Sequence, residues 1–301
     1  MVSWEAIAKS SYWEHPIRLC GRVMRQDRAL LMAIVNRTPD SFYDRGRTYD
    51  WASAVAAVER AVAEGADVID VGGVKAGPGA EVDVREEIRR VIPVVAEIRG
   101  RFPEVAISVD TWRHEVGRPA CQEGADLLND SWAGADPQLA EVAAEFGAGY
   151  VCTHTGTAAP RTRPHRVAFG DVVADVVNEV MHRAEALVRA GVPREGILID
   201  PAHDFGKNTW HSLELTRRFG ELTGLGWPVL ASVSNKDFIG EALDAAVPDR
   251  LAGSLAVTAV CAWQGAAMFR THNVGQTREV LDMVAVLAGR KPPTRAVRGL
   301  A

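Results

Sequence analysis

Short apolar runs, rich in β-branched residues, recur along this chain, and nearly every one ends in a polar residue. The eight runs end at Asn36, Gly72, Asp110, Asn129, His154, Asp200, Ser234 and His272. Segments with helical periodicity separate them, which is the one-dimensional pattern of an α/β fold in which strands and helices alternate. We therefore predict a single-domain (β/α)8 barrel, with its site where the strands end.

The helical segments repeat one local pattern. Trp51–Glu64 carries a single apolar face and ends at Gly65, a typical residue after a helix C-terminus. Similar segments are expected over Arg85–Arg99 and Asp171–Ala190, and the phrase EGAD precedes the strands after both Glu64 and Glu123. A doubly wound open sheet is the alternative. It is disfavoured because no G-x-G-x-x-G follows an early strand and because polar residues end most of the runs.

The length of 301 residues fits one barrel of about 250 residues with short extensions. We expect a leader over residues 1–26 that packs on the barrel, the barrel itself over residues 27–289, and a surface tail over residues 290–301. A net charge of −5 argues against a nucleic-acid surface. No apolar stretch reaches the length of a membrane span. From the charge and from this absence together, neither nucleic acid nor a membrane is an expected partner.

Three of the strand ends carry groups that suit a heterocyclic ligand. Asp110, Asn129 and Asp200 end three different apolar runs, and a barrel would bring them to one rim. A carboxylate at the end of an apolar strand is costly without a partner. Two carboxylates and an amide suit a flat ligand with several N–H donors along one edge, such as a 2-amino-pyrimidinone.

The last two strand ends carry cations and hydrogen-bond donors. Ser234-Asn235-Lys236 follows the seventh run and Arg270-Thr271-His272 follows the eighth. In barrels of this class the corner after the last two strands often binds phosphate. We expect an anion there.

With these motifs in order, the chain resembles the dihydropteroate synthase family of pterin-binding barrels from about residue 29 to residue 288. The resemblance rests on several short strings in sequence, which are NRTPDSF from Asn36, DVGG from Asp70, SVDT from Ser108, LND from Leu128, DPAHDFGK from Asp200, SNKDFIG from Ser234 and RTH from Arg270. It implies a TIM barrel, a homodimer, and a transferase of folate biosynthesis. That reaction condenses a dihydropterin pyrophosphate with p-aminobenzoate and releases pyrophosphate. The four cysteines form no C-x-x-C pair and are expected to be buried, reduced thiols of a cytoplasmic protein.

The resemblance also implies roles for individual residues. Asp110, Asn129, Asp200 and Lys236 would bind the pterin. Asn36, Arg270 and His272 would bind the pyrophosphate, with Mg²⁺ held through Asn36. Of these, Asn36, Lys236, Arg270 and His272 would be catalytic, because they stabilise the charge that leaves with the pyrophosphate.

The departures from the family pattern gather around the second substrate. The family reads Gly-Gly-Glu-Ser-Thr-Arg-Pro-Gly after the second strand, whereas this chain has Ala76 and Gly77 where the Thr and Arg stand. This chain has Arg37 after the loop Asn, where the family has Val. It has Asn235 between Ser234 and Lys236, where the family has Arg. The second-substrate loops are expected to contain Arg37, Thr38, Phe42, Lys75, Phe205 and Ser234. Loss of a guanidinium that Lys cannot replace like for like predicts weak or absent standard activity.

Three alternatives stay open. The chain is either a working synthase with remodelled loops or a catalytically silent pterin-binding paralogue. A methyltetrahydrofolate–corrinoid methyltransferase is less favoured, since it has no need of the cluster of Lys236, Arg270 and His272. A transition-metal site formed by Asp200, His203, Asp204 and His272 ranks below the pterin interpretation.

Overall fold

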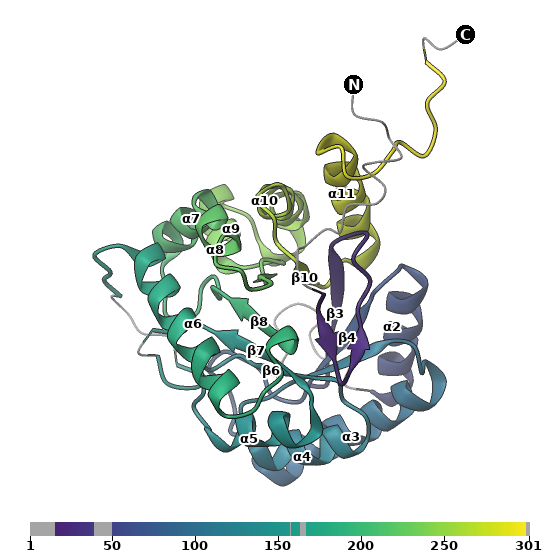
Figure 1. Ribbon diagram of the computed structural model, residues 1–301, viewed down its shortest axis with the longest axis vertical. Helices are drawn as coiled ribbons and strands as arrows, with labels where there is room; N and C mark the ends of the chain where they lie inside the picture. The colour runs from purple at the N-terminus through teal and green to yellow at the C-terminus, as the bar shows by residue number, and fades with distance from the viewer. Residues whose placement is uncertain (1–15, 39–49, 157, 163–166, 299–301) are drawn as a thin grey trace.

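The computed structural model describes residues 16–38, 50–156, 158–162 and 167–298. Among them, eight parallel strands form one sheet in the order β8-β7-β6-β5-β4-β3-β10-β9. A parallel bridge between Ile199 and Val229 joins the two edges, so the sheet nearly closes (Figure 1). The strands are β3 (Leu30–Asn36), β4 (Val68–Gly72), β5 (Ala106–Asp110), β6 (Leu127–Asp130), β7 (Gly149–Thr153), β8 (Ile197–Asp200), β9 (Leu230–Ala231) and β10 (Met268–Thr271).

Each of these strands lies in one of the eight predicted runs, and the barrel prediction is confirmed. The open doubly wound alternative is wrong, because the parallel bridge between Ile199 and Val229 joins β8 to β9, the two strands that would be the free edges of an open sheet. β9 is only two residues long, although the apolar run before Ser234 predicted a longer strand.

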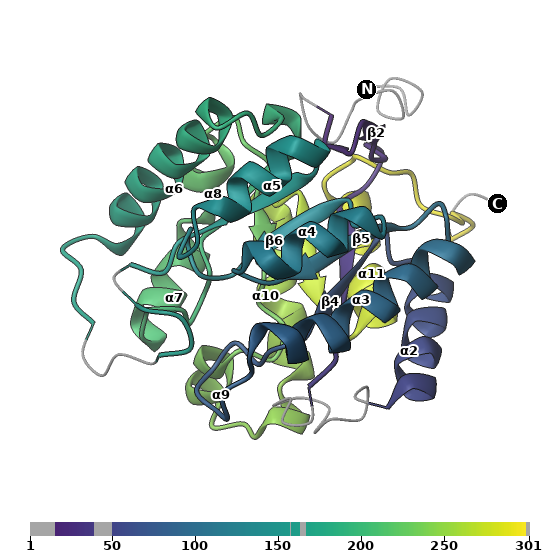
Figure 2. The ribbon, with the colours of Figure 1, turned by 90° about the horizontal axis from the view of Figure 1, so that it is seen from below.

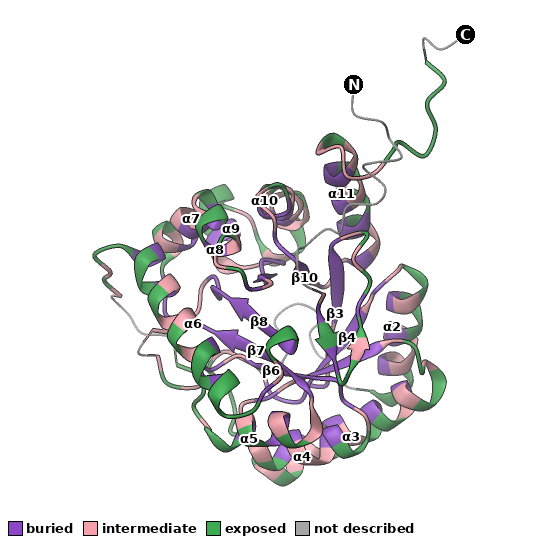
Figure 3. Ribbon diagram, viewed as in Figure 1, coloured by how far each residue is buried: buried purple, intermediate pink, exposed green. Residues whose placement is uncertain are grey.

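Helices surround the barrel and turn their polar faces to solvent (Figures 2 and 3). The described helices are α2 (Trp51–Ala63), α3 (Val84–Arg101), α4 (His114–Gln122), α5 (Gln138–Phe146), α6 (Val172–Arg189), α7 (Thr209–Arg217), α8 (Phe219–Thr223), α9 (Asp237–Leu243), α10 (Leu251–Trp263) and α11 (Val274–Leu287). The side chains of Asp50, Asp83 and Asp171 cap α2, α3 and α6 by accepting hydrogen bonds from first-turn amides. No helix in the described ranges is long and apolar enough to cross a membrane.

Alternation along the strands divides the barrel interior into an apolar base and a polar mouth. The interior core includes Leu30, Met32, Val68, Ala106, Leu127, Val151, Leu198, Leu230 and Met268. Because side chains alternate between the two faces of a strand, the next inward residues toward the mouth are those two positions further along. They are Ile34, Asp70, Ser108, Asn129, Thr153, Asp200, Ser232 and Arg270.

A small hairpin packs on the apolar base. Its strands are β1 (Arg18–Leu19) and β2 (Arg22–Val23), paired antiparallel, which the sequence pattern did not predict. Ile17 and Leu19 are fully buried in the interior core. A Cβ at Gly149 would lie 2.5 Å from Cδ2 of Leu19, so glycine leaves the room that this leucine fills. The base is therefore packed, and the space for a ligand lies at the mouth.

Candidate functional site

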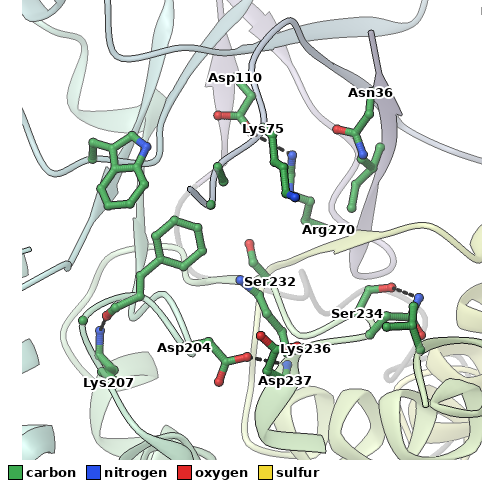
Figure 4. A pocket seen from close by; sticks show the side chains of 18 of the residues that line it. Asn36, Lys75, Asp110, Asp204, Lys207, Ser232, Ser234, Lys236, Asp237 and Arg270 are labelled. Atoms are coloured by element: carbon green, nitrogen blue, oxygen red, sulfur yellow. Dashed lines mark hydrogen bonds and ion pairs between the residues drawn. The ribbon is translucent and has the colours of Figure 1, made fainter. Parts of the chain in front are cut away.

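A cavity of about 490 Å³ lies at the carboxyl ends of the strands (Figure 4). Its floor and walls come from nearly every strand end and from the loops after β4, β6 and β8. Of the predicted site residues, those that line it are Asn36, Thr38, Lys75, Asp110, Phe205, Ser234, Lys236, Arg270 and His272. The structure thus brings most of the predicted residues to one cavity of ligand size.

One side of the cavity, which we call the β4–β6 side, is an ion network of Asp70, Asp110 and Arg270. The guanidinium of Arg270 donates from Nε to Oδ2 of Asp70 at 2.7 Å and from Nη2 to Oδ2 of Asp110 at 2.8 Å. The Asp70 side chain is fully buried, whereas Asp110 and Arg270 keep some exposure to the cavity. Arg270 therefore pairs with two carboxylates at once, which a planar fork of donors can do.

Hydroxyl and amide groups complete this network. Ser108 Oγ donates to Asp70 at 2.5 Å, Asn129 Nδ2 donates weakly to both Asp70 oxygens at 3.3 and 3.4 Å, and Ser131 Oγ donates to Asp110 at 2.8 Å. Burial is the largest influence on the Asp110 carboxyl and raises its pKa, against the opposing effect of Arg270. Asn129 is 3 % exposed and lies under the cavity rather than in its lining.

On the opposite side, which we call the β8–β9 side, Asp200 is held by neutral donors. The backbone amide of Ala202 donates to Oδ1 at 2.7 Å and Ser232 Oγ donates to Oδ2 at 2.7 Å. Asp200 is 5 % exposed and does not line the cavity, whereas Ser232 does. Burial raises the pKa of Asp200, against the hydrogen bond from Ser232.

The predicted lysine of the pterin site stands over an aromatic pair. Lys236 Nζ lies 4.3 Å from the centre of the Phe205 ring, and this ring lies 5.2 Å from that of Trp132. Burial lowers the pKa of Lys236, although Asp204 and Asp200 oppose the shift. The two rings are tilted by 57° to each other and together give the cavity an aromatic wall.

The residues predicted to bind an anion line the cavity but do not converge on one point. His272 Nδ1 lies 3.0 Å from Ser234 Oγ, beside the end of β9, while Arg270 reaches across to the acids of β4 and β5. Asn36 stands between them on β3. A Cβ built on Gly72 would lie 3.5 Å from Asn36 Oδ1 and 3.6 Å from Asp110 Cβ, so the two side chains flank that glycine.

The expected second-substrate residues divide into two groups. Thr38, Lys75, Phe205 and Ser234 line the cavity. Arg37 does not: it is buried, and its Nε donates to the carbonyl of Arg90 in α3 at 3.4 Å. Phe42 lies outside the described residues. Lys75 is thus the added cation that the structure directs toward the cavity.

The proposed transition-metal group does not assemble. His203 is fully buried, and its ring stacks 5.5 Å from that of Phe238 and 6.3 Å from that of Phe219. Asp204 accepts hydrogen bonds from the backbone amides of Asp237 and Phe238 and so holds the start of α9. Within the described ranges, the groups close enough to share an ion are His114–Glu115–Asp136 and His154–Asp175–Glu179, and neither includes a predicted ligand.

Three residues of the site were missed by sequence reasoning. Asp70 anchors the ion network, although it appeared only inside the DVGG string. Ser232 covers Asp200, and Trp132 forms part of the aromatic wall. The signal for Asp70 was available, since a carboxylate within an apolar strand is costly without a partner. A serine and a tryptophan after strands carry no comparable signal.

Comparison with known proteins identifies the family to which a chain with this site is similar. The family described as pterin binding enzyme matches residues 32–272. A Mycobacterium leprae protein named inactive dihydropteroate synthase 2 is 60 % identical over 287 residues, which cover 94 % of this chain and 99 % of that protein. The dihydropteroate synthase of Escherichia coli K12 is 39 % identical over 266 residues, covering 88 % of this chain and 94 % of the enzyme.

Solved structures, dihydropteroate synthases among them, are similar to this chain as well. The Yersinia pestis dihydropteroate synthase with a sulfonamide drug complex has a TM-score of 0.87 at 32 % identity, covering 92 % of this chain and 100 % of that one. Mycobacterium tuberculosis Rv1207 has a TM-score of 0.72 at 50 % identity, covering 91 % of this chain and 99 % of that one.

Proposed function

The chain belongs to the family of pterin binding enzymes and is dihydropteroate synthase-like, and from this premise we propose that it binds a dihydropterin, with or without its pyrophosphate, in the cavity at the barrel mouth. Condensation with p-aminobenzoate would be weak or absent, so that the chain acts chiefly as a pterin-binding paralogue. The observation that carries the proposal is the set of buried acids around one cavity of ligand size.

The chemistry of the cavity suits a pterin. The aminopyrimidinone edge of a pterin presents N–H donors, which carboxylates accept. Asp110 faces the cavity directly, and Asp200 and Asn129 support its floor. Phe205 offers an aromatic face for the ring, with Trp132 tilted against it, and Lys236 stands over Phe205 as a donor for the carbonyl oxygen of the heterocycle.

A pyrophosphate group would lie toward Asn36 and His272. The residues present fit Mg²⁺, which prefers oxygen ligands and is commonly held by one or two protein groups together with substrate phosphates. Asn36 would hold it through its amide oxygen, which flanks Gly72 beside Asp110. When bound, the ion would supply charge neutralisation for the leaving group.

Two features support weak standard turnover. The loop after β4 places Val74, Lys75, Ala76 and Gly77 around the cavity and contains neither the hydroxyl nor the guanidinium of the family pattern. Arg270, which would have to stabilise the departing pyrophosphate, is engaged with Asp70 and Asp110. The name of the Mycobacterium leprae relative, which calls that protein inactive, agrees with this proposal.

Two measurements test the proposal. Calorimetry with 6-hydroxymethylpterin should show binding, and its absence would refute pterin recognition. An assay with dihydropterin pyrophosphate, p-aminobenzoate and Mg²⁺ should show little product. Turnover at rates of about 1 per second or more, which are ordinary for enzymes, would refute the silent-paralogue proposal while leaving pterin binding intact.

We also propose that the chain forms a homodimer in the cytoplasm. Val260 and Trp263 of α10 and Met283 and Leu287 of α11 are large, apolar and exposed, and these two helices pack side by side. Exposed apolar groups gathered on neighbouring helices often mark a protein interface. Light scattering should give the mass of a dimer, and Trp263→Glu should shift it toward the monomer.

A further inference from the structure

Ser232 occupies a particular place between Asp200 and the cavity. Ile199 lies opposite Val229 in the parallel bridge that joins β8 to β9, so Leu230 is the residue beside Asp200. Ser232 is the next inward residue toward the mouth. Its hydroxyl therefore stands above the carboxylate, and Figure 4 shows Ser232 reaching into the cavity from below Arg270.

The hydrogen bond to Asp200 determines which part of the Ser232 hydroxyl is available to a ligand. Ser232 Oγ donates its only proton to Asp200 Oδ2 at 2.7 Å, while the other oxygen accepts from Ala202. The cavity is left with the lone pairs of a neutral hydroxyl where a carboxylate would otherwise face it. An N–H donor binds a neutral oxygen more weakly than it binds an ionised one.

We propose that Ser232 is a specificity-determining residue whose hydroxyl covers Asp200 and lowers the affinity of the cavity for ligands that present N–H donors to that carboxylate. The inference rests on the proposed pterin site and deepens it. It separates the two cavity acids: Asp110 is open to a ligand on the β4–β6 side, whereas Asp200 is satisfied internally on the β8–β9 side. A pterin must then displace the serine hydroxyl or accept the weaker contact.

Removal of the Ser232 hydroxyl should increase the affinity for a pterin. In Ser232→Gly the carboxylate faces the cavity with one oxygen unpaired, and a ligand N–H then satisfies a buried acceptor. We expect 6-hydroxymethylpterin to bind about tenfold more tightly than it binds the wild-type protein, because a hydrogen bond to a charged group contributes roughly that much. Ser232→Ala, which keeps the Cβ, should give a smaller gain in the same direction and carries the test if the glycine variant does not fold.

The double variant Ser232→Gly/Asp200→Asn identifies the source of the gain. If the gain comes from the uncovered carboxylate, the double variant loses it. Calorimetry on all variants, with thermal melting as the folding control, decides between the outcomes. If wild type and both folded single variants bind with equal affinity, the proposed role of Ser232 is refuted. If wild-type binding then still depends on Asp110, the proposed pterin site is retained. A gain that persists in the double variant also refutes the proposed role of Ser232. Binding by none of the proteins overturns the proposed function and the cover together.

Discussion

The two sides of the cavity stabilise their acids by different means. On the β4–β6 side, Asp70 and Asp110 share the full charge of Arg270. On the β8–β9 side, the hydrogen bonds to Asp200 within the described part of the chain come from a backbone amide and a hydroxyl, with the ammonium groups of Lys207 and Lys236 nearby. The nearby Lys207 is engaged elsewhere, since its ammonium donates to the carbonyls of His154, Ala202 and Phe205 at 2.9 to 3.2 Å.

This difference has consequences for stability and for binding. A buried ion network leaves an uncompensated charge when one member is removed, so the loss of that member destabilises the fold strongly. Dipolar donors can be exchanged for those of a ligand at smaller cost, because no net charge is stranded. Stability should therefore depend most on the first side, while ligand affinity should be adjustable on the second.

The largest effect is expected for Arg270→Ala. It leaves the fully buried Asp70 and the adjacent Asp110 without their cation, and loss of one partner of such a network costs about 3–5 kcal/mol. Urea unfolding measures the loss. Arg101→Ala is the matched control, since its ion pair with Glu59 is exposed on both sides and should contribute less than about 1 kcal/mol. Equal losses in the two variants would contradict the special status of the network.

The next effect is on binding. Asp110→Asn keeps the shape of the side chain but replaces a charged acceptor that faces the cavity, so affinity for 6-hydroxymethylpterin should fall by roughly 10- to 100-fold. Calorimetry measures the change. Asp200→Asn should cost less than Asp110→Asn, because Ser232 already stands between Asp200 and the ligand. The reverse order would show that the two acids have been assigned to the wrong sides of this comparison.

The barrel and the meeting of most predicted site residues at one cavity were predictable from the sequence, because they depend on patterns longer than a single residue. Eight apolar runs, seven of them with polar ends, identify eight strands, and the geometry of a barrel then brings Asn36, Asp110, Lys236, Arg270 and His272 to one mouth. The depth of each residue was not predicted. Ends of runs were treated as equivalent, whereas alternation places Asn129 and Asp200 one inward position deeper than Asp110 along their own strands.

Side-chain direction was the other gap. Arg37 follows Asn36 directly and therefore points to the opposite face of the strand, toward α3. The same alternation rule, applied to Val68, Asp70 and Gly72, would have placed Asp70 inside the barrel. Neutral site residues were not predicted for a different reason. Burial of a serine such as Ser232 costs less free energy than burial of a charge, so its position alone predicts no partner.

A smaller effect is expected from pH on the β8–β9 side. Burial, with Lys207 and Lys236 nearby, lowers the pKa of His203 to about 3, so the folded protein keeps the ring neutral while the unfolded chain takes up a proton below about pH 6.5. The stability from this group is complete above that pH and is lost as the pH falls toward 3. His203→Phe, which keeps a ring between Phe219 and Phe238, should remove this dependence.

Urea unfolding of wild type and His203→Phe at pH 7.5 and 5.5 measures this difference. One buried neutral histidine should cost the wild type about 1.4 kcal/mol more than the variant over that interval. His154, whose pKa is lowered by burial to about 4, is present in both proteins and cancels from the comparison. Parallel losses in the two proteins would exclude His203 as the group that titrates.

The smallest effect concerns the turn that carries the amide donor to Asp200. Ala202 has a φ of +49°, a left-handed conformation that costs an L-residue about 1–2 kcal/mol. Ala202→Gly removes this strain but gives the unfolded chain more freedom, worth about 0.5–1 kcal/mol, so the variant should be more stable by roughly 0.7 kcal/mol, the difference between the midpoints of the two ranges. Ala57→Gly, in the middle of α2, is the matched control and should lose about 1 kcal/mol. Because glycine keeps the backbone amide, Asp200 retains its donor in Ala202→Gly and pterin affinity should stay unchanged; a loss of affinity would mean that the alanine methyl group, and not only the amide, holds the β8–β9 side in place.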